Sequence, residues 1–303
     1  MLLSRLNYRR LAQGAVAAVF SAVQVLAHAQ TGSTPLIWEV RSPTNTVYLF
    51  GTIHVGARQM YPLSPAVEQA YAASRVVALE ADPTNQSAAI GAVERFAYKP
   101  PDNLADHVSP ALMQDLNETL PSIGLPIEYA RTMRPTLLAM SIAMMEISRQ
   151  GYDPGLGLDM RFAQRAKQDG KRIVELESIE GQLALLDSFS PETQEGMLRA
   201  TVDGIKDGSL AGDVHELVSA WSAGSPERLM DQVDKEVDGL PAAQAAEMRE
   251  RLYDARNREM ADRIVAMLTE REPTFVAIGV GHVLGPSGIV ELLRKRGYQV
   301  KKL

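Results

Sequence analysis

Two short patterns, one near each end of the chain, constrain the fold most. An apolar run rich in β-branched and aromatic residues ends at Gly51, and His54 follows three residues later. A second run of this kind ends at Gly279, and His282 follows at the same spacing. Such runs are typical of strands, and a glycine at a strand end lets the backbone turn sharply or pass close to a ligand. The sequence therefore predicts two strand–Gly-x-x-His units.

Each unit is followed by a predicted helix and a further strand. After the first unit, Ser64 and Pro65 supply an N-cap and a first-turn proline, and the apolar run 75–80 reads as a strand buried on both faces. After the second unit, the pattern predicts a helix at 287–296 and a strand at 298–302. A strand–helix–strand connection implies parallel strands with a right-handed crossover. The two halves therefore predict an α/β fold with a mainly parallel sheet.

The remaining segments complete this architecture. Turn residues in the middle of segment 36–50 predict a hairpin, which makes the sheet mixed. Between the two halves, residues from about 85 to 270 have mainly helical patterns, with one further strand predicted at 171–177. We therefore expect one α/β domain over residues 30–303 that carries a helical insertion.

The composition limits the chemistry of any site. The 303 residues include no cysteine, which excludes a disulfide framework, a thiol nucleophile and a cysteine-ligated metal. A metal would have to be held by histidine, aspartate, glutamate or backbone oxygen. The formal net charge is −6 and no long basic run is present, so we do not expect nucleic acid as a partner.

The first 29 residues have the pattern of a secretory signal peptide. Arginines at 5, 9 and 10 form a basic start, a mostly apolar stretch follows at 11–26, and Ala27-His28-Ala29 fits the small-x-small cleavage pattern. The alternative is an N-terminal membrane anchor, but polar residues interrupt the stretch, whereas a span needs about 20 mostly apolar residues. We expect a cleaved signal and a secreted or periplasmic protein with no later membrane span.

Three polar side chains stand at or just past the predicted carboxyl ends of strands, namely His54, Glu80 and His282. Ligands of open α/β sheets bind at that edge. Two neutral imidazoles and a carboxylate suit a divalent metal with open positions, which would lower the pKa of a bound water and polarise a carbonyl. Without a metal, Glu80 beside a histidine remains a candidate general base. The alternative is that both histidines are structural turn residues.

Arg256 is a further candidate, because it lies in the charged helical segment 253–261 before the strand that leads to His282. Its guanidinium could stabilise a developing oxyanion or bind a substrate carboxylate. The alternative is a solvated charged face. His107 and His215 lie in polar segments, where we expect structural or exposed side chains.

Seven segments carry a resemblance, in this order along the chain: 49–55, 77–82, 157–159, 174–178, 256–257, 260–261 and 278–282. With these segments the chain resembles the TraB/PrgY/GumN family, which includes the Tiki metalloproteases, over nearly all of residues 34–303. The resemblance implies a fold akin to erythromycin esterase-like and ChaN-like proteins.

The resemblance also implies a metal-dependent, peptidase-type site. It makes His54, Glu80 and His282 the metal or catalytic residues, and it makes Arg256 and Asn257 a substrate or transition-state pair. Manganese or cobalt is the implied metal, and zinc also suits the donor set.

We therefore predict an exported metal-dependent hydrolase, a peptidase in which metal-activated water attacks a carbonyl of a peptide or small-molecule substrate. Two alternatives remain open at this point. One is a non-catalytic protein that sequesters a peptide, haem or another small ligand in the same crevice. The other is a hydrolase that acts on esters.

Overall fold

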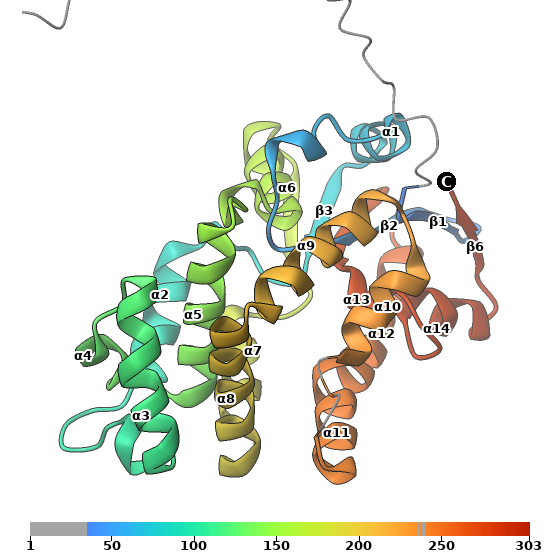
Figure 1. Ribbon diagram of the computed structural model, residues 1–303. Coiled ribbons are helices and arrows are strands. Elements are labelled where there is room, and N and C mark those ends of the chain that lie inside the picture. The colour runs from blue at the N-terminus through green and yellow to red at the C-terminus, as the bar shows by residue number, and fades with distance from the viewer. Residues whose placement is uncertain (1–34, 236, 238–239) are drawn as a thin grey trace, which may run out of the picture. The chain divides into compact units, whose positions relative to one another are not determined.

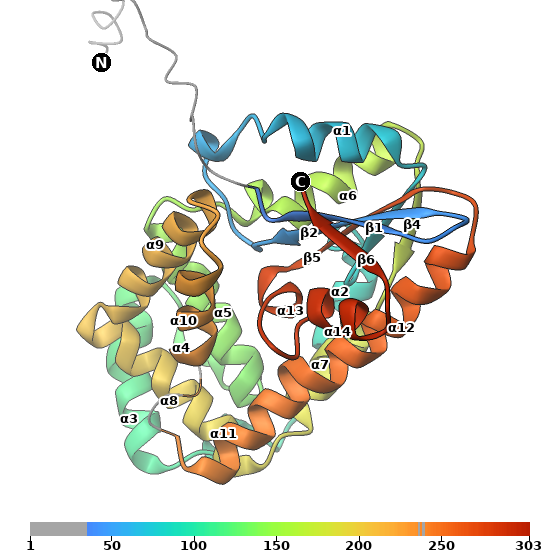
Figure 2. The same ribbon diagram turned by 90° about the vertical axis from the view of Figure 1, so that its right-hand side faces the viewer.

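The computed structural model describes residues 35–235, 237 and 240–303, and it contains a six-stranded sheet (Figure 1, Figure 2). The predicted signal peptide at residues 1–29 lies outside the described residues. The strand order is β4-β3-β5-β2-β1-β6. The strands are β1 (Ile37–Arg41), β2 (Thr46–Thr52), β3 (Val76–Leu79), β4 (Arg172–Glu175), β5 (Thr274–Gly279) and β6 (Gln299–Lys302).

The four neighbouring strands β4, β3, β5 and β2 are parallel. β1 forms the predicted antiparallel hairpin with β2, and β6 pairs antiparallel with β1 at the sheet edge. The predicted α/β fold with a mixed, mainly parallel sheet is therefore confirmed. Because β5 lies between β2 and β3, the carboxyl ends of these three strands are adjacent.

Helices cover both faces of the sheet. α1 and α6 lie on one face, and α12 and α14 lie on the other (Figure 2). On the α6 side, Phe162 packs against Phe50 of β2 and Phe275 of β5, with ring centroids 5.7 and 4.7 Å apart, and this buried aromatic cluster fixes α6 to the sheet. The helices that pack against the sheet or its strand ends are α1 (Pro65–Ala73), α6 (Leu158–Gln168), α12 (Ala255–Thr269), α13 (Val280–Val283) and α14 (Ile289–Lys295).

The other helices lie to one side of the sheet (Figure 1), and several of them pack around a second apolar core. Leu116, Leu138 and Leu198, from three different helices, are fully buried in that core. The predicted helical stretch of about 85–270 contains these helices, and it also contains β4, α6 and α12, which belong to the sheet layers. The helices are α2 (Gln86–Arg95), α3 (Pro110–Thr119), α4 (Ile127–Ala130), α5 (Pro135–Arg149), α7 (Ile179–Asp187), α8 (Pro191–Asp207), α9 (Ser209–Ser222), α10 (Pro226–Lys235) and α11 (Ala242–Arg249).

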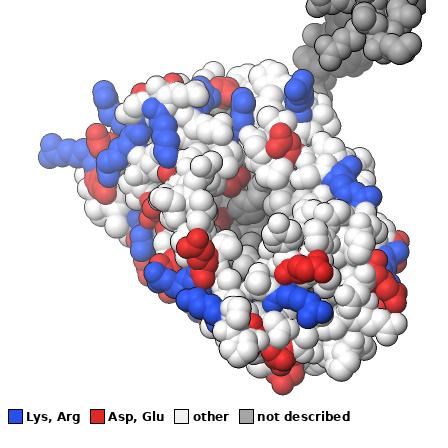
Figure 3. Space-filling model, turned by 90° about the vertical axis from the view of Figure 1, so that its left-hand side faces the viewer, with Lys and Arg blue, Asp and Glu red and all other residues white. Residues whose placement is uncertain are grey.

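The surface carries charges of both signs. Basic and acidic side chains intermingle on the face drawn in Figure 3, as expected for a protein whose formal net charge is only −6. Within the part of the chain that the structure describes, no helix has both the length and the apolar composition that crossing a membrane requires.

Candidate active site

The structure brings His54, Glu80 and His282 together at the carboxyl edge of the sheet. His54 follows β2, Glu80 follows β3, and His282 lies on α13 directly after β5. A Cβ atom placed on Gly279 would lie 2.9 Å from Oε1 of Glu80, 3.6 Å from Cδ2 of His282 and 3.8 Å from Nε2 of His54. The three side chains therefore surround one glycine, and the absence of a side chain there leaves room for their approach.

His54 is oriented by a carboxylate that the sequence analysis did not assign to the site. Its Nδ1 lies 3.1 Å from Oδ2 of Asp159, in the first turn of α6. A carboxylate only accepts hydrogen bonds, so Nδ1 donates and Nε2 remains for other contacts. The backbones of the two segments lie close together. The N–H of Leu158 donates to the carbonyl of Ile53 at 3.1 Å. Gly157 packs so near the His54 carbonyl that an added Cβ would lie 2.3 Å from its oxygen.

His282 is oriented by an amide. Its Nδ1 lies 2.7 Å from Oδ1 of Asn257, whose Nδ2 donates to the carbonyl of Ser287 at 3.0 Å. The amide nitrogen is the donor to Ser287, so the amide oxygen accepts from Nδ1–H and leaves Nε2 facing the site. Asn257 is 1% exposed and His282 is 5% exposed. This histidine is therefore fixed in one tautomer and one orientation.

Glu80 is held by three donors. The backbone N–H of Gly279 donates to Oε1 at 2.5 Å. Nε2 of Gln182 and Nη2 of Arg256 each donate to Oε2 at 3.3 Å. Oε1, the oxygen on the side of the histidines, lies 4.0 Å from Nε2 of His282.

Arg256 joins Glu80 to a second carboxylate, Glu177. Nε and Nη2 of Arg256 each lie 2.7 Å from an oxygen of Glu177, and Nη1 donates to the carbonyl of Leu252. Only 17% of the arginine side chain is exposed. The structure thus directs this guanidinium at two carboxylates, and the predicted contact with a substrate or an oxyanion stays a prediction. The same holds for Asn257, whose amide is engaged by His282 and Ser287.

The segment that carries these two residues has an unusual start. A π-helical turn, Glu250–Asp254, separates α11 from α12, and Arg256 and Asn257 follow in the first turn of α12. Such turns are rare in proteins and are frequent at functional sites. Here the turn immediately precedes two residues that contact Glu80 and His282.

Two carboxylates were missed in the sequence for different reasons. Glu177 follows β4, and its backbone N–H donates to the Glu80 carbonyl at 2.6 Å. The strand-end argument that selected Glu80 also applies to this neighbouring parallel strand, so a signal was present. Asp159 lies in segment 157–159, which carries the family resemblance, but no local pattern pairs it with His54, which lies 105 residues earlier in the chain.

The two histidines differ in their protonation. Partial desolvation by the surrounding protein lowers the pKa of His54, but the hydrogen bond and charge of Asp159, together with the charge of Glu80, outweigh it and raise the pKa to about 9. The His54 side chain is 59% exposed, which helps the charged ring keep its hydration and supports that direction. Burial and the charge of Arg256 lower the pKa of His282 to about 4, against the opposing charge of Glu80.

Glu80 is ionised over the whole physiological range. Burial would raise its pKa, but the charges of protonated His282, His54 and Arg256 and the N–H of Gly279 lower it to about 2. Above about pH 4 His282 is neutral, so His54, Arg256 and the backbone donor account for the effect near neutral pH. At pH 7 the site therefore combines a neutral imidazole, an imidazolium and a carboxylate.

The donor chemistry suits a divalent metal, whereas the spacing of the donors is wide. Both Nδ1 atoms are held by oxygen acceptors, which is the usual arrangement for histidines that bind metal through Nε2. Across the described residues, no group of three or more histidine, aspartate or glutamate side chains is placed to hold a metal as it stands. Ligands about 2.1 Å from one metal lie roughly 3.0–3.5 Å apart, so the 4.0 Å between His282 and Glu80 would have to shorten.

Comparisons with known proteins place the chain in a family over nearly all of its described length. A family model described as the TraB/PrgY/gumN family matches residues 36–302, which confirms the resemblance seen in the sequence. The chain is 27% identical over 327 residues to metalloprotease TIKI1 of Danio rerio, covering 90% of this chain and 64% of that protein. The chain thus spans less than two thirds of that relative.

Two bacterial relatives have lengths closer to that of this chain. An uncharacterized protein of Treponema pallidum (strain Nichols) is 24% identical over 270 residues, covering 86% of this chain and 80% of that protein. Uncharacterized protein YbaP of Escherichia coli (strain K12) is 24% identical over 248 residues, covering 82% and 87% respectively. No solved structure gives a significant match, so the likeness to erythromycin esterase-like and ChaN-like folds stays a prediction.

Proposed function

The chain belongs to the TraB/PrgY/gumN family, and on that basis we propose that it is a metal-dependent hydrolase that cleaves peptide bonds. The observation that carries the proposal is the convergence of His54, Glu80 and His282 around Gly279, with each histidine held through Nδ1. Relatives named as metalloproteases support the reaction class.

We propose that His54 and His282 hold the metal through their Nε2 atoms and that Glu80 is either the third ligand or the general base. When bound, the metal would polarise a substrate carbonyl and lower the pKa of a water molecule. Manganese and cobalt follow from the family resemblance, and zinc suits two imidazoles and a carboxylate equally well.

The chain's other residues would position these three groups. Asp159 and Asn257 fix the tautomers of the two histidines, which is the role of outer partners at metal sites. Arg256 and Gln182 hold one oxygen of Glu80, so that the other oxygen faces the histidines. Because Glu80 is ionised above about pH 2, it is available as a carboxylate ligand throughout the physiological range. A pKa this low makes it a weak base, so the general-base role requires that its pKa rise when metal and substrate bind.

We also propose that the protein is exported and that residues 1–29 are removed as a signal peptide. The basic start, the apolar stretch and Ala27-His28-Ala29 support this proposal. Sequencing the N-terminus of protein recovered from the periplasm or the medium tests it. A mature chain that begins at Gln30 is expected, and a retained Met1 would contradict the proposal.

Metal analysis combined with a peptide-library cleavage assay tests the hydrolase function. We expect the purified protein to take up manganese, cobalt or zinc and to cleave peptides only when loaded. The variants His54→Ala and His282→Ala should lose both properties. His107→Ala is a matched control, because His107 also pairs with an aspartate, Asp102 at 2.7 Å, but lies outside the site.

Each outcome of this experiment is informative. Equal metal content in the wild type and both site variants would overturn the metal site. Metal binding that depends on His54 and His282, without cleavage of any peptide or ester, would overturn the hydrolase and favour the ligand-sequestering alternative. Cleavage of esters but not of peptides would retain the metal-dependent hydrolase and replace the substrate class.

A further inference from the structure

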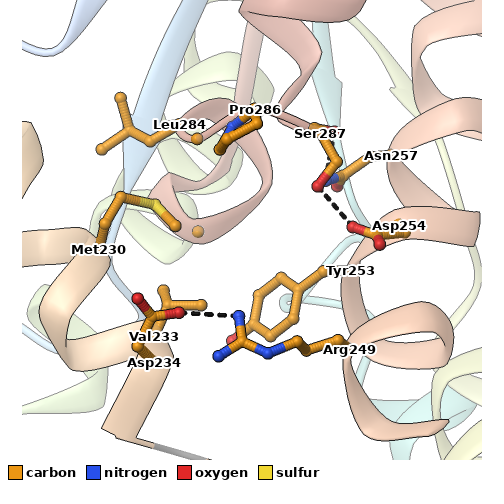
Figure 4. A pocket seen from close by; sticks show the side chains of 12 residues that line it. Met230, Val233, Asp234, Arg249, Tyr253, Asp254, Asn257, Leu284, Pro286 and Ser287 are labelled. Carbon is orange, nitrogen blue, oxygen red and sulfur yellow. Dashed lines mark hydrogen bonds and ion pairs between the residues drawn. The ribbon is translucent and has the colours of Figure 1, made fainter. Parts of the chain in front are cut away.

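A pocket of about 540 Å³ lies beside the candidate active site, and the proposed reaction does not use it (Figure 4). It is formed by α10, the π-helical turn and the loop that follows α13. Its volume lies within the range of about 300–1,000 Å³ that is usual for ligand sites. The pocket therefore has room for a side chain together with neighbouring backbone.

The pocket and the site share a wall. Tyr253 lines the pocket, and its ring centroid lies 5.5 Å from that of His282. Asn257, which holds Nδ1 of His282, lines the pocket as well. A Cβ on Gly281 would lie 2.9 Å from Cε1 of Tyr253, so this glycine allows the close packing of the wall. Only the ring of Tyr253 thus separates His282 from the pocket on this side.

Much of the pocket's lining is apolar. Met230, Val233, Leu284 and Pro286 supply apolar surface around the hollow (Figure 4). Such surface suits an aliphatic chain and does not by itself select a charged group.

The charged residues of the lining favour a cation. Among the described residues, the lining contains two aspartates and one arginine, a balance of −1. Arg249 pairs with Asp234 at 2.7 Å, which leaves Asp254. That carboxylate accepts a hydrogen bond from the Ser287 hydroxyl at 2.5 Å, and no ion pair found among the described residues includes it. The charge of Arg258 acts on Asp254 from one turn away, but Arg258 makes its ion pair with Glu250. Asp254 therefore has a charge that would attract a further positively charged group.

We propose that this pocket binds a lysine or arginine side chain of the substrate, with the aliphatic stem against the apolar wall and the cationic end at Asp254. Long basic side chains have these two parts, an apolar stem and a charged head. The proposal rests on the proposed hydrolase function, because it makes the pocket a specificity site next to the reacting atoms. The ring of Tyr253 adds an aromatic face, which also attracts cations.

Binding of small blocked amino acids to the full mature chain tests the proposal without any need for catalysis. The probes are the N-acetyl methylamides of lysine, norleucine and glutamate, which separate the contribution of the stem from that of the charge. Methionine methyl groups labelled with ¹³C report binding, since Met230 lies in the pocket wall. We expect the lysine probe to shift the Met230 signal and to bind at least fivefold more tightly than the norleucine probe, and the glutamate probe to bind most weakly.

Three variants make the test specific. Asp254→Asn keeps an acceptor for Ser287 but removes the charge, so it should abolish the preference for lysine over norleucine. Met230→Trp fills the hollow and should weaken both probes. Asp262→Asn removes a carboxylate from the exposed side of α12, where Asp262 pairs with Arg296, and should change nothing.

The outcomes also separate this proposal from the proposed function. Equal binding of the lysine and norleucine probes by the wild type, or a lysine preference that survives Asp254→Asn, would overturn the basic-side-chain pocket. If the probe results are as expected but no peptide is cleaved, the pocket stands and the hydrolase does not. If peptides are cleaved without any preference for lysine or arginine, the hydrolase stands and the pocket proposal is overturned.

Discussion

The backbone N–H of Gly279 donates a hydrogen bond to Oε1 of Glu80 at 2.5 Å, and this bond joins the carboxyl ends of two parallel strands, β5 and β3. It links the second Gly-x-x-His motif, Gly279–His282, to Glu80. The contact requires glycine, since a Cβ at this position would stand 2.9 Å from the same oxygen.

Gly279→Ala should therefore displace Glu80 while preserving the fold. The backbone of Gly279 has φ of −50°, which alanine adopts without strain. The methyl group meets the end of a side chain that Arg256 and Gln182 hold in place. We expect metal affinity and peptidase rate to fall by about tenfold or more, the loss typical of disturbed outer contacts at metal sites, with little change in the melting temperature.

Gly91→Ala is the matched control for that variant. Gly91 lies in α2, and a Cβ there would meet nothing within 4 Å. Alanine in a helix should stabilise the protein by about 0.5–1 kcal/mol without changing activity. If Gly279→Ala has the same small effect on metal uptake as Gly91→Ala, the contact between Gly279 and Glu80 does not shape the site.

Asp159→Asn should lower the pKa of His54 from about 9 toward its ordinary value of about 6.5. The reason is that an amide lacks the negative charge that stabilises the imidazolium. NMR titration of the His54 ring measures the change, and metal affinity should fall by about 10- to 100-fold. Asp102→Asn removes the carboxylate partner of His107 and should leave His54 unaltered. A His54 titration that is the same in both variants would remove Asp159 from the site.

Much of the fold and the core of the site followed from the sequence, because the relevant signals are local. A strand that ends in glycine, an N-cap with a first-turn proline and an apolar run that ends at Glu80 each lie within a few neighbouring residues. The rule that ligands collect at the carboxyl ends of parallel strands then placed His54, Glu80 and His282 together, and the structure brings them around Gly279.

The contacts that orient these groups could not be predicted from the sequence, because they join residues far apart in the chain. Asp159 reaches His54 across 105 positions, and Arg256 reaches Glu80 across 176 positions. Whether a helical residue faces a distant side chain depends on how the helix docks. For Arg256 that position follows a π-helical turn, which propensity and periodicity do not indicate.

Arg256→Ala should destabilise the protein, because it leaves Glu80 and Glu177 side by side without the guanidinium that joins them. Removing one partner of a buried charge cluster costs on the order of 3 kcal/mol, and the arginine side chain is only 17% exposed. Urea denaturation measures the difference. Arg258→Ala is the control, since Arg258 and its partner Glu250 are each 52% exposed, and it should leave the transition unchanged. Equal midpoints for the two variants would refute a structural role for Arg256.

Metal binding should release one proton near neutral pH, and His54 should be its source. A metal ligand must be deprotonated, and the metal-free protein keeps His54 protonated up to about pH 9. His282 is neutral above about pH 4 and Glu80 is ionised above about pH 2, so neither exchanges a proton in this range. The apparent affinity should therefore rise about tenfold per pH unit between pH 6 and 8 and level off above about 9. Calorimetric titration in buffers of different ionisation enthalpy counts the protons, and a count of zero at pH 7 would contradict a His54 ligand that is protonated in the metal-free protein.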